Sequence, residues 1–190
     1  RHSFPTRRSS DLAFNFNNLT ISGNKGTGAV TLVNAGTIGV AGTLTVTATN
    51  TSYATTGNTF EFNGTNQNIP AFTFNNLSIT GSATKTLTGN VTTSGALSFA
   101  SGSDILSLGT NTLTLNGTVT GSGFLKGSSS SNLTIGGSGA LGTLNFDQTT
   151  DGTTNVLNNI TVNRSSGTLS LGNKLVVTNT YTPTAGTLTT

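Results

Sequence analysis

A ten-residue phrase occurs twice in this sequence, and the repeat constrains the fold more than any other feature. Phe14-Asn-Phe-Asn-Asn-Leu-Thr-Ile-Ser-Gly23 returns as Phe72-Thr-Phe-Asn-Asn-Leu-Ser-Ile-Thr-Gly81, and a shorter copy follows at Leu157-Asn-Asn-Ile-Thr-Val162. Each copy places an Asn-Asn pair, typical of a turn, before alternating apolar and hydroxylated residues, which are typical of a strand. Because repeated sequences fold as repeated units, we expect each copy to be one structural unit stacked on its neighbours.

The same two-residue alternation runs along most of the chain, whereas the spacing of an amphipathic helix does not occur. The runs 43–49, 111–115 and 167–171 alternate apolar residues with threonine, serine or asparagine. Gly or Asn ends such runs every few residues, and both tolerate the left-handed conformation of a sharp corner. The pattern predicts an all-β fold of short strands, with Leu, Val, Ile and Phe facing inward and Thr and Ser facing outward.

Strands of three to five residues favour a right-handed parallel β-helix, or β-solenoid, with irregular rungs over residues 13–190. We expect the Asn-Asn pairs to stack as a ladder from rung to rung. We also expect three Phe-x-Phe pairs to stack in a dry interior: Phe14/Phe16, Phe60/Phe62 and Phe72/Phe74. The alternative is a set of antiparallel β-sandwich repeats, since Asn63-Gly64, Asn116-Gly117 and Asp151-Gly152 are typical of hairpin turns.

The run from Phe60 to Ile69, which leads into the second copy of the repeat, is similar to phrases in very long, repetitive bacterial proteins that are secreted or surface-bound. The Thr-Leu-Thr-Leu phrase at residues 112–115 is similar to such phrases too. The chain therefore resembles the adhesin-like β-solenoids, many of which are exported by a type IX system. The resemblance implies a structural or adhesive repeat region, a stalk or spacer, whose partners are surface glycans or other cell-surface components. Only 7% of the residues are charged, which fits an extracellular or cell-surface location better than a cytosolic one.

The first twelve residues differ in composition from all that follows. They hold three of the eight basic residues and the single histidine. His2 to Leu12 resembles the one-frame translation of a short-read sequencing adapter, such as a metagenomic library would carry, so we expect residues 1–12 to be non-native and disordered. The chain has no methionine, and we interpret residues 13–190 as a fragment that is truncated at both ends.

The charge pattern does not predict a nucleic-acid or membrane partner. Arg1, Arg7 and Arg8 against Asp11 supply +2 of the formal net charge of +3. The other basic residues are scattered singly, whereas a nucleic-acid surface clusters them. No apolar run approaches the ~20 residues that a membrane helix needs. We therefore expect neither nucleic-acid binding nor membrane insertion.

No motif predicts catalysis, a cofactor or a metal site. The segment from Gly137 to Gly142 matches G-x-G-x-x-G, but residues 143–146 predict a strand where a dinucleotide site needs a helix. Cysteine is absent, and Asp147 and Asp151 are the only acidic residues close in sequence. Calcium prefers six to eight oxygen ligands, so we expect these aspartates to cap turns instead. The chain is predicted not to be an enzyme.

The Thr-x-Thr arrays are the candidate binding face. They comprise Thr43, Thr45, Thr47, Thr84, Thr86 and Thr88. On a flat side of a solenoid they would present a regular grid of methyls and hydroxyls, which resembles the surface of ice-binding β-solenoids and also suits a polysaccharide lattice. Lattice binding, of ice or polysaccharide, is therefore the alternative to a stalk; otherwise threonine is simply the outward strand residue of this fold.

Overall fold

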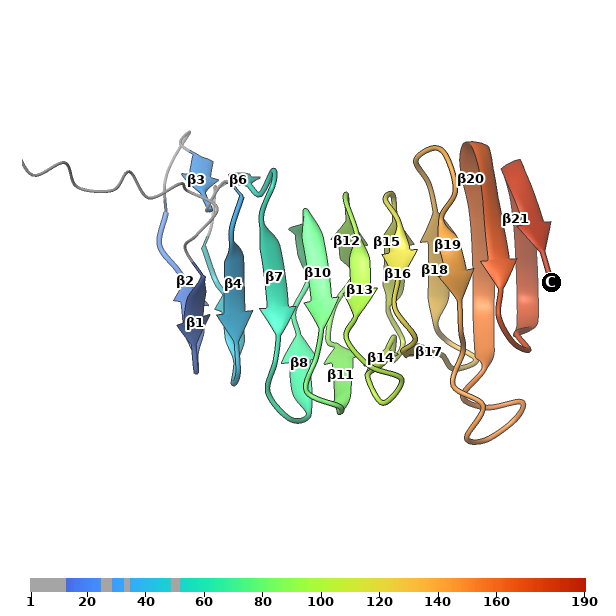
Figure 1. Cartoon of the computed structure of the whole chain (residues 1–190), viewed down its shortest axis with the longest axis horizontal. Coiled ribbons are helices and arrows are strands. Elements are labelled where there is room, and N and C mark those ends of the chain that lie inside the picture. The colour runs from blue at the N-terminus through green and yellow to red at the C-terminus, as the bar shows by residue number, and fades with distance from the viewer. Residues whose placement is uncertain (1–12, 25–28, 33–34, 49–51) are drawn as a thin grey trace, which may run out of the picture.

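The computed structural model describes residues 13–24, 29–32, 35–48 and 52–190. These residues form an all-β chain whose parallel strands stack into a β-solenoid of about eight turns (Figure 1). Every strand pair among the described residues is parallel, so the predicted parallel β-solenoid is confirmed and the antiparallel sandwich is excluded. The expectations for residues 1–12 lie outside the described residues.

Each of the first six turns, or rungs, contains three strands in the same order, and the strands of successive rungs form three walls. Wall A contains β1 (Phe14–Phe16), β4 (Thr37–Val40), β7 (Thr59–Phe62), β10 (Asn76–Ile79), β13 (Leu97–Phe99) and β16 (Val119–Thr120). Wall B contains β2 (Leu19–Ile21), β5 (Leu44–Val46), β8 (Gln67–Ile69), β11 (Thr84–Leu87), β14 (Ile105–Ser107) and β17 (Phe124–Lys126). Wall C contains β3 (Ala29–Thr31), β6 (Ser52–Ala54), β9 (Phe72–Phe74), β12 (Val91–Thr93), β15 (Thr112–Leu115) and β18 (Asn132–Ile135).

The last rungs are built from β19 (Gly142–Leu144), β20 (Val156–Leu171) and β21 (Val176–Thr189). β20 is not a short strand, because it continues through a corner from one wall to the next. Its first half pairs with β18 on wall C, and its last residues pair with β19. The β19 strand begins at the last glycine of the G-x-G-x-x-G segment, so a strand follows this motif, as the sequence predicted.

The rungs are irregular in length, also as predicted. Along wall A the in-register partner of Phe60 is Leu77, and the partner of Leu77 is Leu97, so the second of these two rungs is longer than the first. The interval between the paired residues Gly142 and Leu169 of β19 and β20 is longer still. The corners between walls absorb most of these differences, although the β20–β21 pairing contains register shifts and walls B and C are both interrupted before the third rung.

The core consists of the inward apolar positions of all three walls. Leu44, Leu113 and Leu115 are 3%, 0% and 1% exposed, as the alternation predicted. On wall C, Leu113 is the in-register partner of Val91 and of Leu133, so equivalent side chains stack on one another along the axis. Burying each such side chain contributes about 1.5–3 kcal/mol relative to exposure.

Two of the three Phe-x-Phe pairs lie in the dry interior. Phe60 and Phe62 of β7 meet Phe72 and Phe74 of β9, and all four rings are buried. The ring centroids of Phe60 and Phe62 lie 5.2 Å and 6.1 Å from that of Phe74, in edge-to-face arrangements. Aromatic rings favour this geometry because the positive edge of one meets the negative face of the other.

The prediction for the third pair was wrong. Phe14 and Phe16 are 41% and 36% exposed. They lie on β1, whose one partner among the described strands is β4. The other side of these rings therefore has no described rung to pack against.

The copies of the repeat share a local structure, and each packs on its neighbouring rungs as expected, but the copies do not stack on one another. The first copy forms β1, a corner and β2, and leads from wall A to wall B. The second copy forms β9, a corner and β10, and leads from wall C to wall A. The stretch of chain from Phe14 to Phe72 is not a whole number of rungs, so the same phrase serves two different corners.

The predicted Asn-Asn ladder is consequently wrong for these two copies, but each second asparagine makes the same contact. The Asn18 Oδ1 accepts the Thr43 amide at 2.9 Å, and the Asn76 Oδ1 accepts the Ala96 amide at 2.8 Å. In both cases the donor lies in the next rung, directly before a strand. An asparagine ladder does form at the third copy, where Asn159 donates to Asn132 at 2.8 Å and accepts from Asn179 at 2.9 Å.

Candidate functional site

The six predicted threonines lie on the outside of wall B, in two sets. Thr43, Thr45 and Thr47 belong to β5 and its flanks, and the others belong to β11 and its flanks. All six are exposed or half-buried. β8 lies between the two sets, and Asn66 just before it and Asn68 within it face outward instead of threonine. The sets are therefore separate, and their binding role stays a prediction.

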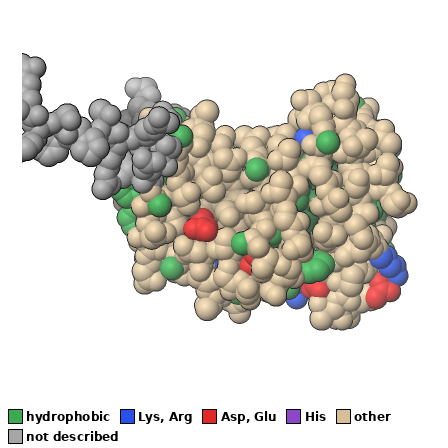
Figure 2. Space-filling model, in the orientation of Figure 1, with side chains coloured by type: hydrophobic (Ala, Val, Ile, Leu, Met, Phe, Trp, Pro, Cys, Tyr) green, Lys and Arg blue, Asp and Glu red, His purple; other side chains and the backbone are tan. Residues whose placement is uncertain are grey.

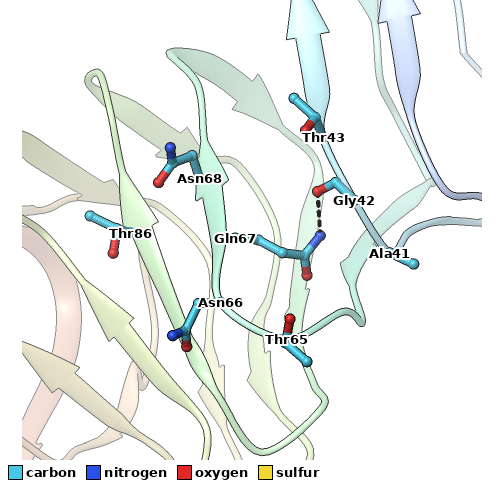
Figure 3. A pocket seen from close by; sticks show the side chains of 8 residues that line it. All are labelled: Ala41, Gly42, Thr43, Thr65, Asn66, Gln67, Asn68 and Thr86. Carbon is cyan, nitrogen blue, oxygen red and sulfur yellow. Dashed lines mark hydrogen bonds between the residues drawn. The ribbon is translucent and has the colours of Figure 1, made fainter.

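Wall B is interrupted between the two sets. β2 and β5 form a two-stranded sheet of their own, and β8 begins a separate four-stranded sheet. The Gln67 side chain reaches across this gap from β8 (Figure 3). Its Nε2 donates to the carbonyls of Val40 and Gly42, both at 2.8 Å, and its Oε1 accepts the Gly64 amide at 2.8 Å. The buried Gln67 amide thus takes the place of the backbone hydrogen bonds that β5 and β8 do not make with each other.

A groove with a cavity volume of about 360 Å³ lies over this gap, and we call it the wall B groove. It is lined by residues 41–43, residues 65–68 and Thr86, so Thr43 and Thr86 of the two predicted sets lie on opposite sides of the same groove (Figure 3). Asn66 is fixed on its rim, because its Oδ1 accepts the Thr84 amide at 3.2 Å. Sequence reasoning missed the groove, since it arises from strands that fail to pair.

Lys85 lies under the rim of the groove with its side chain fully buried. Its Nζ donates to the carbonyl oxygens of Gly64 at 2.7 Å and Thr65 at 2.8 Å. Burial lowers the pKa of Lys85, and the attraction of Asp104 opposes that change. Asp104, also buried, accepts the amides of Ser82 and Ser101 at 2.8 Å and 2.7 Å. The two charges are therefore satisfied inside the fold.

Arg164 is the second buried cation, at the corner inside β20. It is 1% exposed, and burial lowers its pKa. Its guanidinium donates to the carbonyl oxygens of Gly136 and Gly139, each at 2.6 Å, and more distantly to those of Asn116 and Ala140. These acceptors come from the corners of two earlier rungs, so Arg164 joins three rungs and serves the fold.

Wall C carries a longer row of threonines than the one predicted, and we call it the threonine ladder. Its members are in-register partners from β9 to β21: Thr73, Thr92, Thr114, Thr134, Thr161 and Thr182. All are exposed or half-buried. The chain intervals between them are unequal, so no fixed period reveals the ladder in the sequence.

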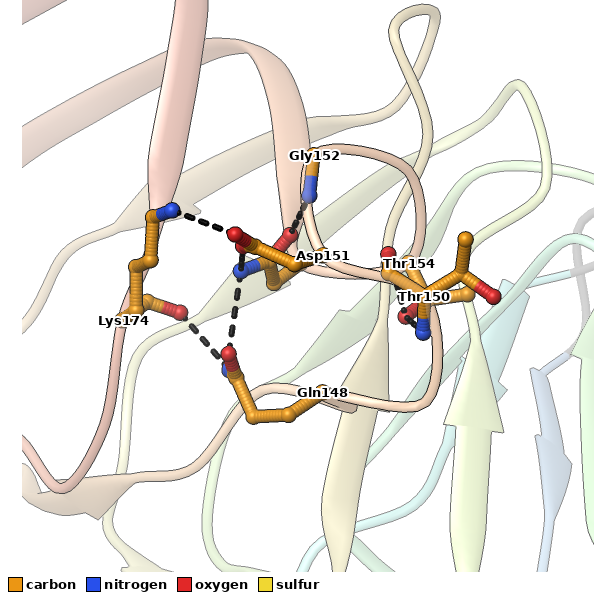
Figure 4. A network of polar contacts seen from close by, with 7 residues as sticks. Gln148, Thr150, Asp151, Gly152, Thr154 and Lys174 are labelled. Carbon is orange, nitrogen blue, oxygen red and sulfur yellow. Dashed lines mark hydrogen bonds and ion pairs between the residues drawn. The ribbon is translucent and has the colours of Figure 1, made fainter.

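Residues 147–155 form a loop that protrudes beside β20 (Figures 1 and 4). The Asp147 Oδ1 accepts the Thr149 amide at 2.9 Å, which confirms a turn-capping aspartate. The Asp151 carboxylate accepts from Asn155 Nδ2 at 2.8 Å and pairs with Lys174 at 2.7 Å. The contact with Lys174, followed by that with Asn155, lowers the pKa of Asp151. Both carboxylates thus serve the loop, and no three His, Cys, Asp or Glu residues of the described chain gather as metal ligands.

Comparison with known proteins gives no match to a protein-family model, a curated protein or a solved structure. Within the described residues, no helix is long and apolar enough to cross a membrane. Two candidate sites stand out by their geometry. They are the wall B groove, which is concave and discrete, and the threonine ladder, which is flat and periodic.

Proposed function

We propose that the chain is a structural stalk or spacer in a secreted or cell-surface bacterial protein, where it holds adhesive parts away from the surface. The observation that supports this most is the single uninterrupted core. Buried apolar residues form one cluster from Ile21 to Leu169, with Leu188 packed against it. Each rung is bonded to the next by parallel strands on at least one wall, so bending the stack would break hydrogen bonds and apolar contacts together.

The outer surface is consistent with this role. The face in Figure 2 consists mainly of uncharged polar side chains and backbone, with few charged groups. Eight turns at ~4.8 Å each give the stack an axial length of roughly 40 Å. Hydroxyl and amide groups keep such a rod hydrated, and a spacer acts through its length and stiffness.

Stiffness is tested directly with spin labels, because the described chain has no free cysteine to interfere. Thr20 on β2 and Thr182 on β21 are exposed and lie near opposite ends of the stack. Labels on Thr20→Cys and Thr182→Cys should give one narrow distance distribution centred at roughly 35 Å, the length of about seven rung spacings. A broad or bimodal distribution would contradict a rigid spacer.

Lattice binding is the second candidate, and the threonine ladder is the observation that favours it. Six threonines spaced by ~4.8 Å form a straight row about 24 Å long. Such a row presents methyls and hydroxyls at regular intervals to a crystalline polysaccharide or to ice. The ladder, on wall C, supports this function better than the interrupted sets on wall B.

Two substitutions distinguish lattice binding by wall C from lattice binding by wall B. Thr114→Tyr changes the middle of the ladder, and Thr86→Tyr makes the same change on wall B. If the ladder binds a lattice, Thr114→Tyr should abolish thermal hysteresis or retention on insoluble cellulose or chitin, and Thr86→Tyr should not. Loss with Thr86→Tyr alone would favour wall B, and no binding by the unchanged chain would leave the spacer function alone.

A further inference from the structure

We propose that the wall B groove binds one neutral, hydroxyl-rich unit, such as a sugar residue of a glycan. The cavity of about 360 Å³ is at the lower end of the volumes that small-molecule sites have. Its position is set by two backbone segments, at residues 41–43 and 65–68, that lie side by side without pairing. The proposal does not depend on the spacer function, since a rod without this groove would hold its ends apart equally well.

The lining of the groove is polar and uncharged. It offers the hydroxyls of Thr43, Thr65 and Thr86 and the amide of Asn68, none of which makes a side-chain hydrogen bond within the described protein. A hydroxyl donates and accepts, and an amide carries two donors and an acceptor. These groups match sugar hydroxyls, which also donate and accept. A charged ligand would find no opposite charge in the lining to offset its loss of hydration.

The floor and rim of the groove are fixed before any ligand binds. Gln67 forms the floor, is 6% exposed, and is held by its three hydrogen bonds to Val40, Gly42 and Gly64. Beneath the rim, the buried Lys85 ammonium holds the carbonyls of Gly64 and Thr65. A site that is already ordered loses little conformational entropy on binding, which favours affinity in a small contact area.

The lining and the shape of the groove argue against a peptide strand and against a crystal surface as its ligand. A peptide added as an extra strand needs pockets for its alternate side chains, whereas Ala41 is the one apolar side chain among the lining residues. A crystal surface needs a flat face, and the groove is concave. A single polar unit that enters the hollow fits both observations.

The test is a titration of the ¹⁵N-labelled chain followed by NMR. The neutral probes are hexasaccharides of β-linked glucose, xylose and N-acetylglucosamine, and the charged control is a heparin hexasaccharide. With at least one neutral probe, the shift changes should concentrate at the amides of residues 41–43 and 65–68 and at the side-chain amide of Asn68. The heparin probe should not shift these signals.

Variants then test the individual contacts. Thr86→Val and Asn68→Ala each remove one unpaired polar group and should weaken binding roughly two- to tenfold, the worth of one hydrogen bond. Thr92→Val makes the same change as Thr86→Val in the same rung, but on wall C, and should leave the affinity unchanged. Asn68 is exposed, so Asn68→Ala should fold even if Thr86→Val does not.

Four results would overturn the proposal. They are no shift at the groove amides with any neutral probe, a preference for heparin, shifts confined to the threonine ladder, and an equal loss of affinity in Thr92→Val. A shift pattern centred on Thr114 and Thr134 would instead support the lattice candidate. The spin-label experiment decides the spacer function separately.

Discussion

Replacing Gly95 with alanine should destabilise the solenoid, because this glycine faces the asparagine corner of the preceding rung. The Gly95 amide donates to the Asn75 carbonyl at 2.7 Å, and the Ala96 amide donates to Asn76 Oδ1 at 2.8 Å. A methyl group on Gly95 would overlap Asn76 Oδ1 and lie 3.0 Å from the Asn75 carbonyl oxygen. The Asn76 side chain would have to move and lose its bond to the next rung.

The magnitude follows from three contributions to the free energy of unfolding. The lost hydrogen bond costs about 1 kcal/mol, and forcing an extra methyl into a packed contact costs about 1–3 kcal/mol. Restricting the unfolded chain returns about 0.4–1 kcal/mol, since alanine is less flexible than glycine. The expected net loss is about 2 kcal/mol.

Gly102→Ala is the matched control. It lies just after β13, whereas Gly95 lies just before it, and a methyl group there would meet nothing nearer than 3.6 Å. Neither glycine has a positive φ, so Gly102→Ala should keep or raise stability by about 0.4–1 kcal/mol. Urea unfolding followed by circular dichroism measures both variants, provided that the slope with urea is unchanged.

A double-mutant cycle tests the cause. If the clash with Asn76 is responsible, Asn76→Ala combined with Gly95→Ala should cost less than the sum of the single changes. Additive losses, or a Gly95→Ala variant as stable as Gly102→Ala, would refute the corner argument.

Two further predictions concern the core. Phe74→Ala should lower the free energy of unfolding by about 3–5 kcal/mol, since Phe74 is fully buried among three other rings. Phe14→Ala, at an exposed ring, should change it by less than about 0.5 kcal/mol. Similar losses for the two variants in urea unfolding would show that Phe74 is not in the core. Burial lowers the pKa of Lys85, so between its pKa in the folded protein and the ordinary lysine value the unfolded chain binds more protons and stability should rise with pH. Lys85→Met should remove that rise, and an identical pH profile of unfolding in the variant would contradict it.

The fold was predictable because period two, short runs and frequent Gly or Asn all indicate the same architecture. The repeat was misleading in one respect. Its phrase encodes a strand, a corner and a strand, but not which corner of the coil it occupies. The uneven rung lengths then place Phe14 and Phe72 on different walls. Local sequence specifies the unit, and the register depends on the lengths of the segments between units.

The buried position of Lys85 follows from the alternation of the strand, although the residue type alone would suggest an exposed side chain. Lys85 lies between Thr84 and Thr86 and in phase with Leu87, and it is buried with Leu87. The strand pattern therefore marked position 85 as inward, although lysine is rarely buried without a partner. Its carbonyl acceptors at Gly64 and Thr65 belong to another rung, and no local pattern indicates them.

Wall C and wall B differ in the residues that their strands align on the outer face, and this decides which ligand each wall suits. From β9 to β21 every strand of wall C pairs with the next, and most length differences are absorbed outside it, as in the loop at residues 147–155. The register shift between Leu157 and Asn159 lies before Thr161, which still pairs with Thr182. The six threonines of the ladder stay aligned for that reason.

Wall B breaks between β5 and β8, at the same rung where wall C breaks between β6 and β9, and the hydrogen bonds of Gln67 cross that break on wall B. Beyond the break, the wall B residues in register with Thr86 are Asn68, Ser107 and Lys126, so no threonine row forms there. Of these two walls, wall C alone therefore offers a regular row of threonines to a periodic surface, and the wall B groove suits a single polar unit.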